Sequence, residues 1–243
     1  MRADGRAADE LRPVKLAANY IPHAEGSVLI EVGFTRVICT ATVEDGVPPW
    51  RKGTGEGWVT GEYAMIPRAT LHRTARDAGR GRLSGRSQEI QRLIGRSLRA
   101  VMRLDTLGER TIIVDCDVIQ ADGGTRAAAI TGGYLALALA CQRLLDQRIL
   151  RTLPLTDSVA ATSVGILGDQ FLLDLTYEED SRAQVDMNVV ITGSGRLVEV
   201  QATAEGRPFT SAELDRLLAL GKKGVEELLA KQHELLPLNF AAP

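Results

Sequence analysis

The sequence has few of the residues from which metal centres and disulfide frameworks are built. Its 243 residues include three histidines and three cysteines. The cysteines are far apart in the sequence, without metal-ligand spacing, and an odd number argues against a disulfide framework. Each is surrounded by Val, Ile, Leu or Ala: Cys39, Cys116 and Cys141. We therefore expect three small, buried thiols in a protein of the reducing cytoplasm.

Long apolar runs are absent as well. No stretch of about 18 uncharged apolar residues occurs, so no membrane span is expected. Residues 1–15 lack the apolar segment of a signal peptide. No Ser-His-Asp or Cys-His arrangement can be recognised, which argues against covalent catalysis.

Lysine is missing from one segment that is rich in arginine. Residues 68–103 contain ten arginines and only two acids, which gives this segment a formal charge of +8 and the remaining chain −10. Guanidinium groups bind phosphate oxygens in pairs, so a polyanion such as nucleic acid is the first candidate partner. The alternative is a set of solvated helix faces and ion pairs between subunits, and charge alone leaves both open.

Hydrophobic periodicity predicts the regular elements. In the first half it indicates two strands within 27–45 around a turn near Gly33, strands at 58–66 and 111–119, and helices from Ser87 and from about 127 to 145. The segment 68–85, rich in arginine and glycine, is expected to be an exposed, mobile loop. In the second half the pattern predicts hairpins within 162–180 and 187–205 and a helix from Thr210, where Glu213 completes a capping box.

This repetition predicts an α/β fold of two similar halves, 1–150 and 151–243. Each half is expected to be a sheet with helices packed against it. No Pro/Ser-rich linker separates them, so we expect the halves to be fused into one compact two-layer unit.

A candidate phosphate site is the sequence Gly123-Gly124-Thr125-Arg126 between a predicted strand and an apolar helix. A helix N-terminus has free backbone N–H groups and attracts anions. The glycines allow a close approach, and the two side chains add a hydroxyl and a guanidinium. Arg86, just before the basic helix, is a second candidate ligand. A plain tight turn and one more surface arginine are the alternatives.

The second candidate site is acidic. Five acids fall within a segment that we predict to be strand, loop and strand: Asp174, Glu178, Glu179, Asp180 and Asp186. Grouped carboxylates can hold Mg²⁺ or divide into a metal ligand and a general acid. The alternative is a solvated loop that balances arginines across an interface. Taken with the arginines, the two sites indicate chemistry at phosphorus on a polyanionic substrate.

Four segments carry a specific resemblance to a known family, and together they span most of the chain from about Asp4 to Leu236. They read DGRAADELRPV, TGEYAMIPRATLHRTARDAGRGRLSGRSQEIQRLIGRSLRA, DCDVIQADGGTRAAAITGGYLAL and LDLTYEEDSRAQVDMNVVITGSG. They resemble the ribonuclease PH family of bacterial phosphate-dependent 3′-to-5′ exoribonucleases. The resemblance implies a duplicated, ribosomal-protein-like β-α unit and an enzyme that trims tRNA precursors and other structured RNAs such as ribosomal RNA.

The resemblance also implies roles for individual residues. Inorganic phosphate, the co-substrate, is bound by Arg86, Gly124, Thr125 and Arg126, and it releases nucleoside diphosphates. Asp180 and Asp186 serve the metal ion and proton transfer, with their division of labour and the choice between Mg²⁺ and Mn²⁺ left open. RNA is held by Arg68, Arg73 and Arg76. The family assembles as a homohexameric ring, a trimer of dimers.

Two alternatives to a nuclease remain. A non-catalytic, RNA-binding ring subunit of the exosome type would keep the fold, but such a subunit should have lost at least one site residue. The matched positions Arg86, Asp180 and Asp186 and the GTR motif are all intact. A simple basic RNA-binding protein would leave the phosphate site and the acids without a use.

Overall fold

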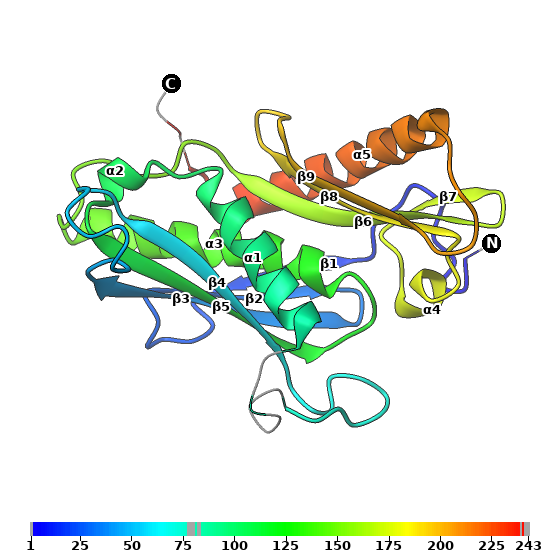
Figure 1. The fold of residues 1–243 in the computed structure, drawn as a ribbon, viewed down its shortest axis with the longest axis horizontal. Coiled ribbons are helices and arrows are strands. Elements are labelled where there is room, and N and C mark those ends of the chain that lie inside the picture. The colour runs from blue at the N-terminus through cyan, green and yellow to red at the C-terminus, as the bar shows by residue number, and fades with distance from the viewer. Residues whose placement is uncertain (1, 77–80, 82–83, 239, 241–243) are drawn as a thin grey trace.

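The computed structural model describes residues 2–76, 81, 84–238 and 240, which form two β-sheets with helices between and around them (Figure 1). The first sheet has the strand order β1-β2-β3-β5-β4. Its strands are β1 (Val14–Ala18), β2 (Gly26–Val32), β3 (Thr35–Asp45), β4 (Trp58–Met65) and β5 (Arg110–Gln120). Neighbouring strands are antiparallel except β4 and β5, which are parallel. Parallel strands need a long crossover, and this one contains α1 (Gly85–Arg99) and α2 (Leu104–Leu107).

The second sheet is antiparallel throughout, with the order β7-β6-β8-β9. Its strands are β6 (Val159–Leu167), β7 (Gln170–Leu173), β8 (Val185–Thr192) and β9 (Leu197–Ala204). The short helix α4 (Tyr177–Asp180) lies between β7 and β8, and α5 (Ser211–Leu235) follows β9 and packs on this sheet. The two hairpins predicted here are confirmed.

The helix α3 (Thr125–Asp146) joins the two halves. It contacts β2, β3 and β5 of the first sheet and β6 and β8 of the second, and Figure 1 shows it running along the first sheet. By length and composition it could cross a membrane, but 78% of its apolar window is buried inside the protein. A helix that is apolar all round belongs in a core. Its position confirms a compact α/β fold.

The two outer helices, α1 and α5, bury the apolar faces that were predicted from the sequence. In α1, Ile90, Leu93, Ile94 and Leu98 are buried, while arginines occupy much of the opposite side. Thr210 accepts a hydrogen bond from the backbone N–H of Glu213 and completes the predicted capping box at the start of α5. The periodicity of 3.6 residues is therefore a sound guide wherever a helix has one apolar face.

Three short elements were not predicted from the sequence: β1, α2 and α4. In β1 only alternate residues are half-buried, so its hydrophobic signal is weak. The helices α2 and α4 have four residues each, too few for a periodic pattern. The fold also brings together two of the cysteines that are far apart in the sequence, because Cys39 and Cys116 are opposite each other on β3 and β5, both as free thiols. The division into 1–150 and 151–243 stays a prediction, with one sheet on each side of it.

Candidate active site

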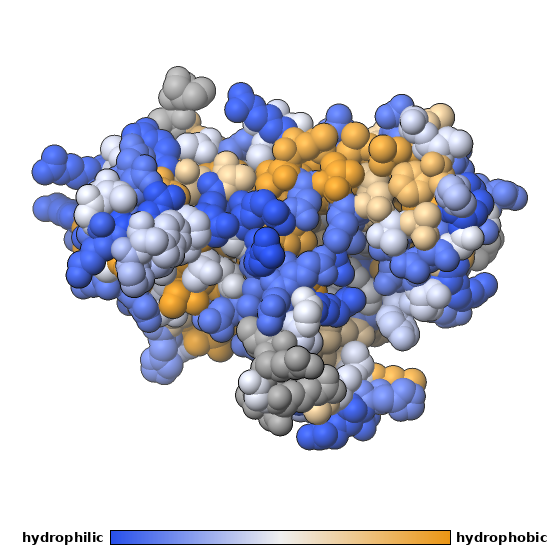
Figure 2. All heavy atoms as spheres, viewed as in Figure 1, coloured by the Kyte–Doolittle hydropathy of each residue, from blue (hydrophilic) through white to orange (hydrophobic). Residues whose placement is uncertain are grey.

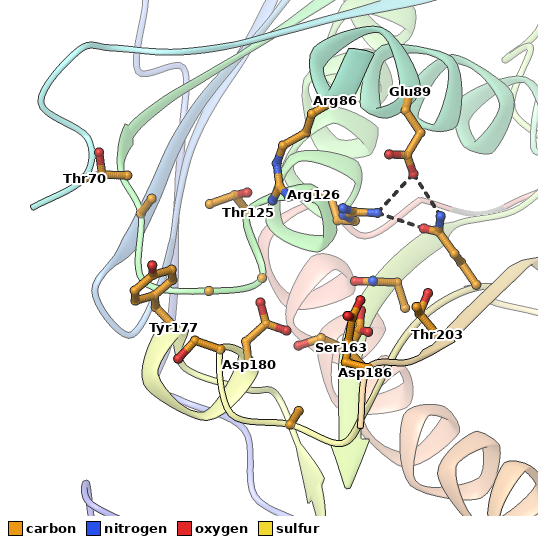
Figure 3. Close-up of a pocket in the computed structure, with 18 of the residues that line it drawn as sticks. Thr70, Arg86, Glu89, Thr125, Arg126, Ser163, Tyr177, Asp180, Asp186 and Thr203 are labelled. Atoms are coloured by element: carbon orange, nitrogen blue, oxygen red, sulfur yellow. Dashed lines mark hydrogen bonds and ion pairs between the residues drawn. The ribbon is translucent and has the colours of Figure 1, made fainter. Parts of the chain in front are cut away.

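A cleft of about 640 Å³ collects residues from both halves of the chain (Figure 3). The first half contributes the N-terminal turns of α1 and α3. The second half contributes α4 and one face of the second sheet, from β6, β8 and β9. It is lined by the four residues predicted to bind phosphate and by two acids of the predicted acidic site: Arg86, Gly124, Thr125, Arg126, Asp180 and Asp186.

Residues 123–126, here called the glycine turn, enter α3 in a conformation that needs glycine. Gly123 and Gly124 have φ angles of 76° and 66°, in the left-handed region that side chains disfavour. A Cβ on Gly123 would also lie 2.5 Å from the carbonyl oxygen of Leu175. The turn can therefore pack directly against the segment that carries α4. No side chain caps α3, so its first N–H groups remain available to a ligand.

The Thr125 and Arg126 side chains are fixed by partners outside the turn. The Tyr63 hydroxyl and Thr125 Oγ1 are 2.8 Å apart. Arg126 Nη1 donates to Gln201 Oε1 at 2.8 Å and to Glu89 Oε1 at 3.2 Å. Gln201 also donates to Glu89 at 2.9 Å, closing the triangle visible in Figure 3. One nitrogen of Arg126 is thereby engaged, and the other two have no partner among the described residues.

Arg86 reaches the cleft from the first turn of α1. Ser84 caps this helix by accepting from the Ser87 backbone N–H at 3.1 Å, and Figure 3 shows the Arg86 side chain pointing toward Thr125. The N-termini of α1 and α3 thus meet at one place. Their dipoles and two guanidinium groups make that end of the cleft electropositive.

The acid pair, Asp180 and Asp186, faces this electropositive end. Burial, followed by the neighbouring carboxylates of Asp180 and Glu205, raises the pKa of Asp186. Partial removal from water also raises the pKa of Asp180, and the guanidinium groups of Arg86 and Arg126 offset part of that rise. Asp186 Oδ1 is buried without a hydrogen-bond partner in the described part of the chain. Such an oxygen is costly unless a cation or proton satisfies it.

The other acids of the predicted cluster do not belong to the cleft, and their assignment to an acidic site is wrong. Asp174 forms a bidentate pair with Arg12, at 2.9 Å to Nε and 2.7 Å to Nη2. Glu179 pairs with Arg2 at 2.7 Å. Glu178 lies 3.4 Å from Arg182 on the surface. The segment contains α4 rather than a plain loop, since Thr176 and Glu179 form a capping box.

Arg2, Arg6 and Arg12, here called the N-terminal arginines, were not predicted to support the site. All three are buried. Burial disfavours the charge of Arg12, but its bond to Asp174 raises its pKa. The Arg12 guanidinium also donates to the carbonyl oxygens of Asp122 and Gly123. Buried arginine and aspartate therefore fix the backbone that leads into the glycine turn.

Arg68, Arg73 and Arg76, here called the loop arginines, lie beside the cleft rather than in its lining. They follow β4, are exposed, and have no ion pair or hydrogen bond to the described residues. Thr70, from the same segment, does line the cleft. The predicted mobile loop extends into residues 77–80 and 82–83, which lie outside the described residues.

Several polar residues of the cleft were missed. Asp186 and Asn188 alternate with apolar residues along β8 and are opposite Thr203 and Gln201 on β9. The period of two along β8 could have placed Asn188 beside Asp186. Tyr177, the first residue of α4, gave no such signal.

Comparison with known proteins identifies the family. Models of the 3′ exoribonuclease family match this chain in both halves, domain 1 over residues 10–143 and domain 2 over residues 157–224. The chain belongs to the ribonuclease PH family of 3′ exoribonucleases. It is 58% identical to ribonuclease PH of Bacillus subtilis over 97% of each chain. It is also 58% identical to ribonuclease PH of Moorella thermoacetica, over 97% of this chain and 94% of that one.

Solved structures agree with the fold. The chain resembles rice (Oryza sativa) Rrp46 with a TM-score of 0.80 at 19% identity, covering 98% of this chain and 100% of that one. It resembles the Archaeoglobus fulgidus exosome with RNA bound to the active site with a TM-score of 0.77 at 23% identity, over 95% and 92% of the two chains. The family assignment confirms the predicted enzyme class, a phosphate-dependent 3′ exoribonuclease acting on RNA, over the alternative of a non-catalytic ring subunit.

Proposed function

We propose that the cleft is where inorganic phosphate attacks the last phosphodiester of an RNA strand. The products are a nucleoside diphosphate and an RNA shortened by one nucleotide. One observation carries the proposal: two helix N-termini with two arginines face a pair of carboxylates across a single cleft. Phosphorolysis needs both, because two anions must be held together and a leaving oxygen must then be neutralised.

The glycine turn and Arg86 are suited to hold the attacking phosphate. Backbone N–H groups at the start of α3, the Thr125 hydroxyl and the guanidinium of Arg86 all offer donors, and an anion at a helix N-terminus is favourable. Arg126 keeps two nitrogens for the ligand while Glu89 and Gln201 orient it. Pre-organised donors of this kind lose little entropy when the phosphate binds.

The acid pair is suited to the leaving group. The bond from phosphorus to the 3′ oxygen of the preceding nucleotide breaks, and that oxygen needs a proton. The raised pKa values of Asp180 and Asp186 favour a carboxyl group that carries a proton at higher pH than usual. Either residue can supply it, and the other remains a carboxylate.

The same carboxylates fit a divalent cation, for which we propose Mg²⁺. The described residues include no group of three His, Cys, Asp or Glu side chains able to hold a metal. Mg²⁺, however, commonly binds through one or two carboxylates together with substrate phosphates and water. The buried Asp186 Oδ1, which has no hydrogen-bond partner in the part of the chain that the structure describes, is a suitable ligand. When bound, the cation would neutralise charge on the scissile phosphate.

We propose tRNA precursors as the main substrates and the loop arginines as their electrostatic contacts. Exposed arginines beside the cleft can follow a phosphate backbone without reading bases. We also propose a homohexameric ring, a trimer of dimers, working in the cytoplasm. Leu197 and Val200 on the edge strand β9 are 48% and 39% exposed, and such apolar edge positions suit contact between copies.

An acid-pair variant tests the proposed chemistry. Asp186→Asn should lower the rate of phosphorolysis by about 10²–10⁴-fold, because it removes a charged ligand and a proton carrier. RNA binding in phosphate-free buffer should hardly change. The matched control is Glu178→Gln, an exposed acid near the same cleft, which should retain full activity. Equal losses of rate and RNA affinity in Asp186→Asn would contradict the assignment.

A further inference from the structure

Tyr177 is a large aromatic side chain left exposed inside the cleft. It is 67% exposed and lines the cleft three residues before Asp180. The other large exposed aromatic side chains of the described residues are Tyr20, Phe34 and Trp50, and none of them lines the cleft. Aromatic residues make up only 4% of this protein, and an exposed one such as Tyr177 contributes little to the core. Exposed aromatic surface in a binding site usually serves a ligand.

The backbone of Tyr177 is held firmly although its side chain is free. Its N–H donates to Asp122 Oδ1 at 3.4 Å, and the preceding residue is the cap of α4. A Cβ on Gly123 would lie 2.8 Å from the Tyr177 nitrogen, so the glycine turn and Tyr177 are in close contact. The Tyr177 hydroxyl has no hydrogen-bond partner among the described residues. The ring is thus held next to the phosphate site while most of its surface remains exposed.

The position of the ring indicates which ligand it meets. Figure 3 shows Tyr177 on the side of the cleft where Thr70 lies. Arg126 lies on the other side, and Asp180 lies between Tyr177 and Arg126 in this view. Thr70 belongs to the segment that carries the loop arginines. Thr70, Tyr177 and the acid pair line the same cleft, so an RNA strand that runs from those arginines to the acid pair would pass along the side on which Tyr177 lies.

We propose that Tyr177 stacks on a base at the 3′ end of the bound RNA. This inference rests on the proposed function of the cleft and adds a binding residue to it. Every base has a π-face, so stacking is tolerant of sequence. That property suits an enzyme that removes whichever nucleotide ends the strand. The ring would fix the terminal nucleotides, and with them the phosphodiester, against the attacking phosphate.

Equilibrium binding of a short single-stranded RNA in phosphate-free buffer tests the proposal without depending on catalysis. Tyr177→Ala should weaken binding about tenfold, the effect expected for one lost stacked base. Tyr177→Phe keeps the ring and should bind like the wild-type protein. Tyr20→Ala, which removes an exposed tyrosine outside the cleft, is the matched control and should also bind normally. A Tyr177→Phe variant as weak as Tyr177→Ala would assign the effect to the hydroxyl and overturn the proposal.

RNAs with one abasic nucleotide locate the partner base. The abasic nucleotide is placed in turn at each of the last three positions. At one of these positions the RNA should bind to the wild-type protein and to Tyr177→Ala with equal affinity, because the base that stacks on Tyr177 is already missing. If Tyr177→Ala weakens every abasic RNA as much as intact RNA, stacking is excluded. In kinetics the variant should raise KM for RNA and leave KM for phosphate unchanged. A different outcome would contradict the proposed function itself. In that case the variants bind RNA as expected, but the wild-type protein forms no phosphate-dependent product.

Discussion

The N-terminal arginines and the loop arginines have opposite surroundings in the same molecule. The N-terminal arginines are buried, and carboxylates of the second half satisfy them, such as Asp174 and Glu179. The loop arginines are exposed and form no ion pair with the described residues, although Arg76 is near enough to Asp117 to oppose the rise that burial causes in the pKa of that carboxyl group. Figure 2 shows hydrophilic residues dominating the surface around the described part of that loop. One residue type therefore serves two physical purposes.

The difference shows what arginine needs in each setting. A buried guanidinium must be paired, because an unpaired buried charge is costly. The ion pairs and hydrogen bonds of the N-terminal arginines hold the glycine turn and α4 in place. An exposed guanidinium without a partner contributes little to folding and keeps its charge for a polyanion. The comparison predicts that changes in the two sets will separate stability from RNA binding.

The largest effect should come from the buried set. Asp174→Asn keeps the shape of the side chain but removes the closest charge partner of Arg12, which keeps only the longer pair with Asp122 at 3.7 Å among the described ion pairs. Breaking a buried pair in this way costs about 3–5 kcal/mol. Chemical denaturation should show that loss in the free energy of unfolding. Arg76→Ala, from the exposed set, should change the same quantity by less than about 0.5 kcal/mol. Similar losses in both variants would contradict the distinction.

Arg126 stands between the two sets, because it is oriented by Glu89 yet faces the ligand. Arg126→Ala should lower kcat/KM for phosphorolysis by about 10²–10³-fold, the usual cost of losing one pre-organised donor. The unfolding midpoint should remain close to that of the wild-type protein. Arg151→Ala, an exposed arginine outside the cleft, serves as the control for general loss of charge. Full activity of Arg126→Ala would remove Arg126 from the phosphate site.

The loop arginines should affect RNA affinity and the dependence of that affinity on salt concentration. Replacing Arg68, Arg73 and Arg76 together by alanine should weaken RNA binding and flatten its dependence on salt concentration. Each lost phosphate contact lowers the slope of log affinity against log salt by about 0.7 for single strands, so three give about 2. Binding titrations at several salt concentrations measure the slope. A slope equal to that of the wild-type protein would exclude the loop arginines from the RNA path.

The smallest expected effect is the part of the pH dependence of stability that comes from Glu179 alone. Burial opposes the charge of Glu179, but the Arg2 hydrogen bond lowers the pKa of Glu179 below its usual value. A carboxylate with a lowered pKa adds stability above its unfolded pKa, near 4.5, and that contribution is lost as the pH falls through its folded pKa. Unfolding measurements between neutral and acidic pH should show the loss. Glu179→Gln should be less stable at neutral pH and show a weaker acid dependence.

Local patterns predicted much of this molecule because their causes are local. The apolar face of α1, the capping box at Thr210 and the turn near Gly33 each depend on neighbouring residues. The glycine turn could likewise be predicted, since a glycine pair before an apolar helix has a local reason. The roles of Asp174 and Asp180 could not be separated in this way. They are six residues apart, and only the tertiary fold buries one against Arg12 and leaves the other in the cleft.

The need for orthophosphate decides whether this cleft performs phosphorolysis. The purified protein is incubated with a 3′-extended tRNA, with and without inorganic phosphate, and the released nucleotides are identified. If the glycine turn and the two cleft arginines hold the attacking phosphate, nucleoside diphosphates form only when phosphate is present, and trimming stops without it. Equal trimming in phosphate-free buffer, with nucleoside monophosphates as products, would mean that water is the nucleophile and would contradict the account.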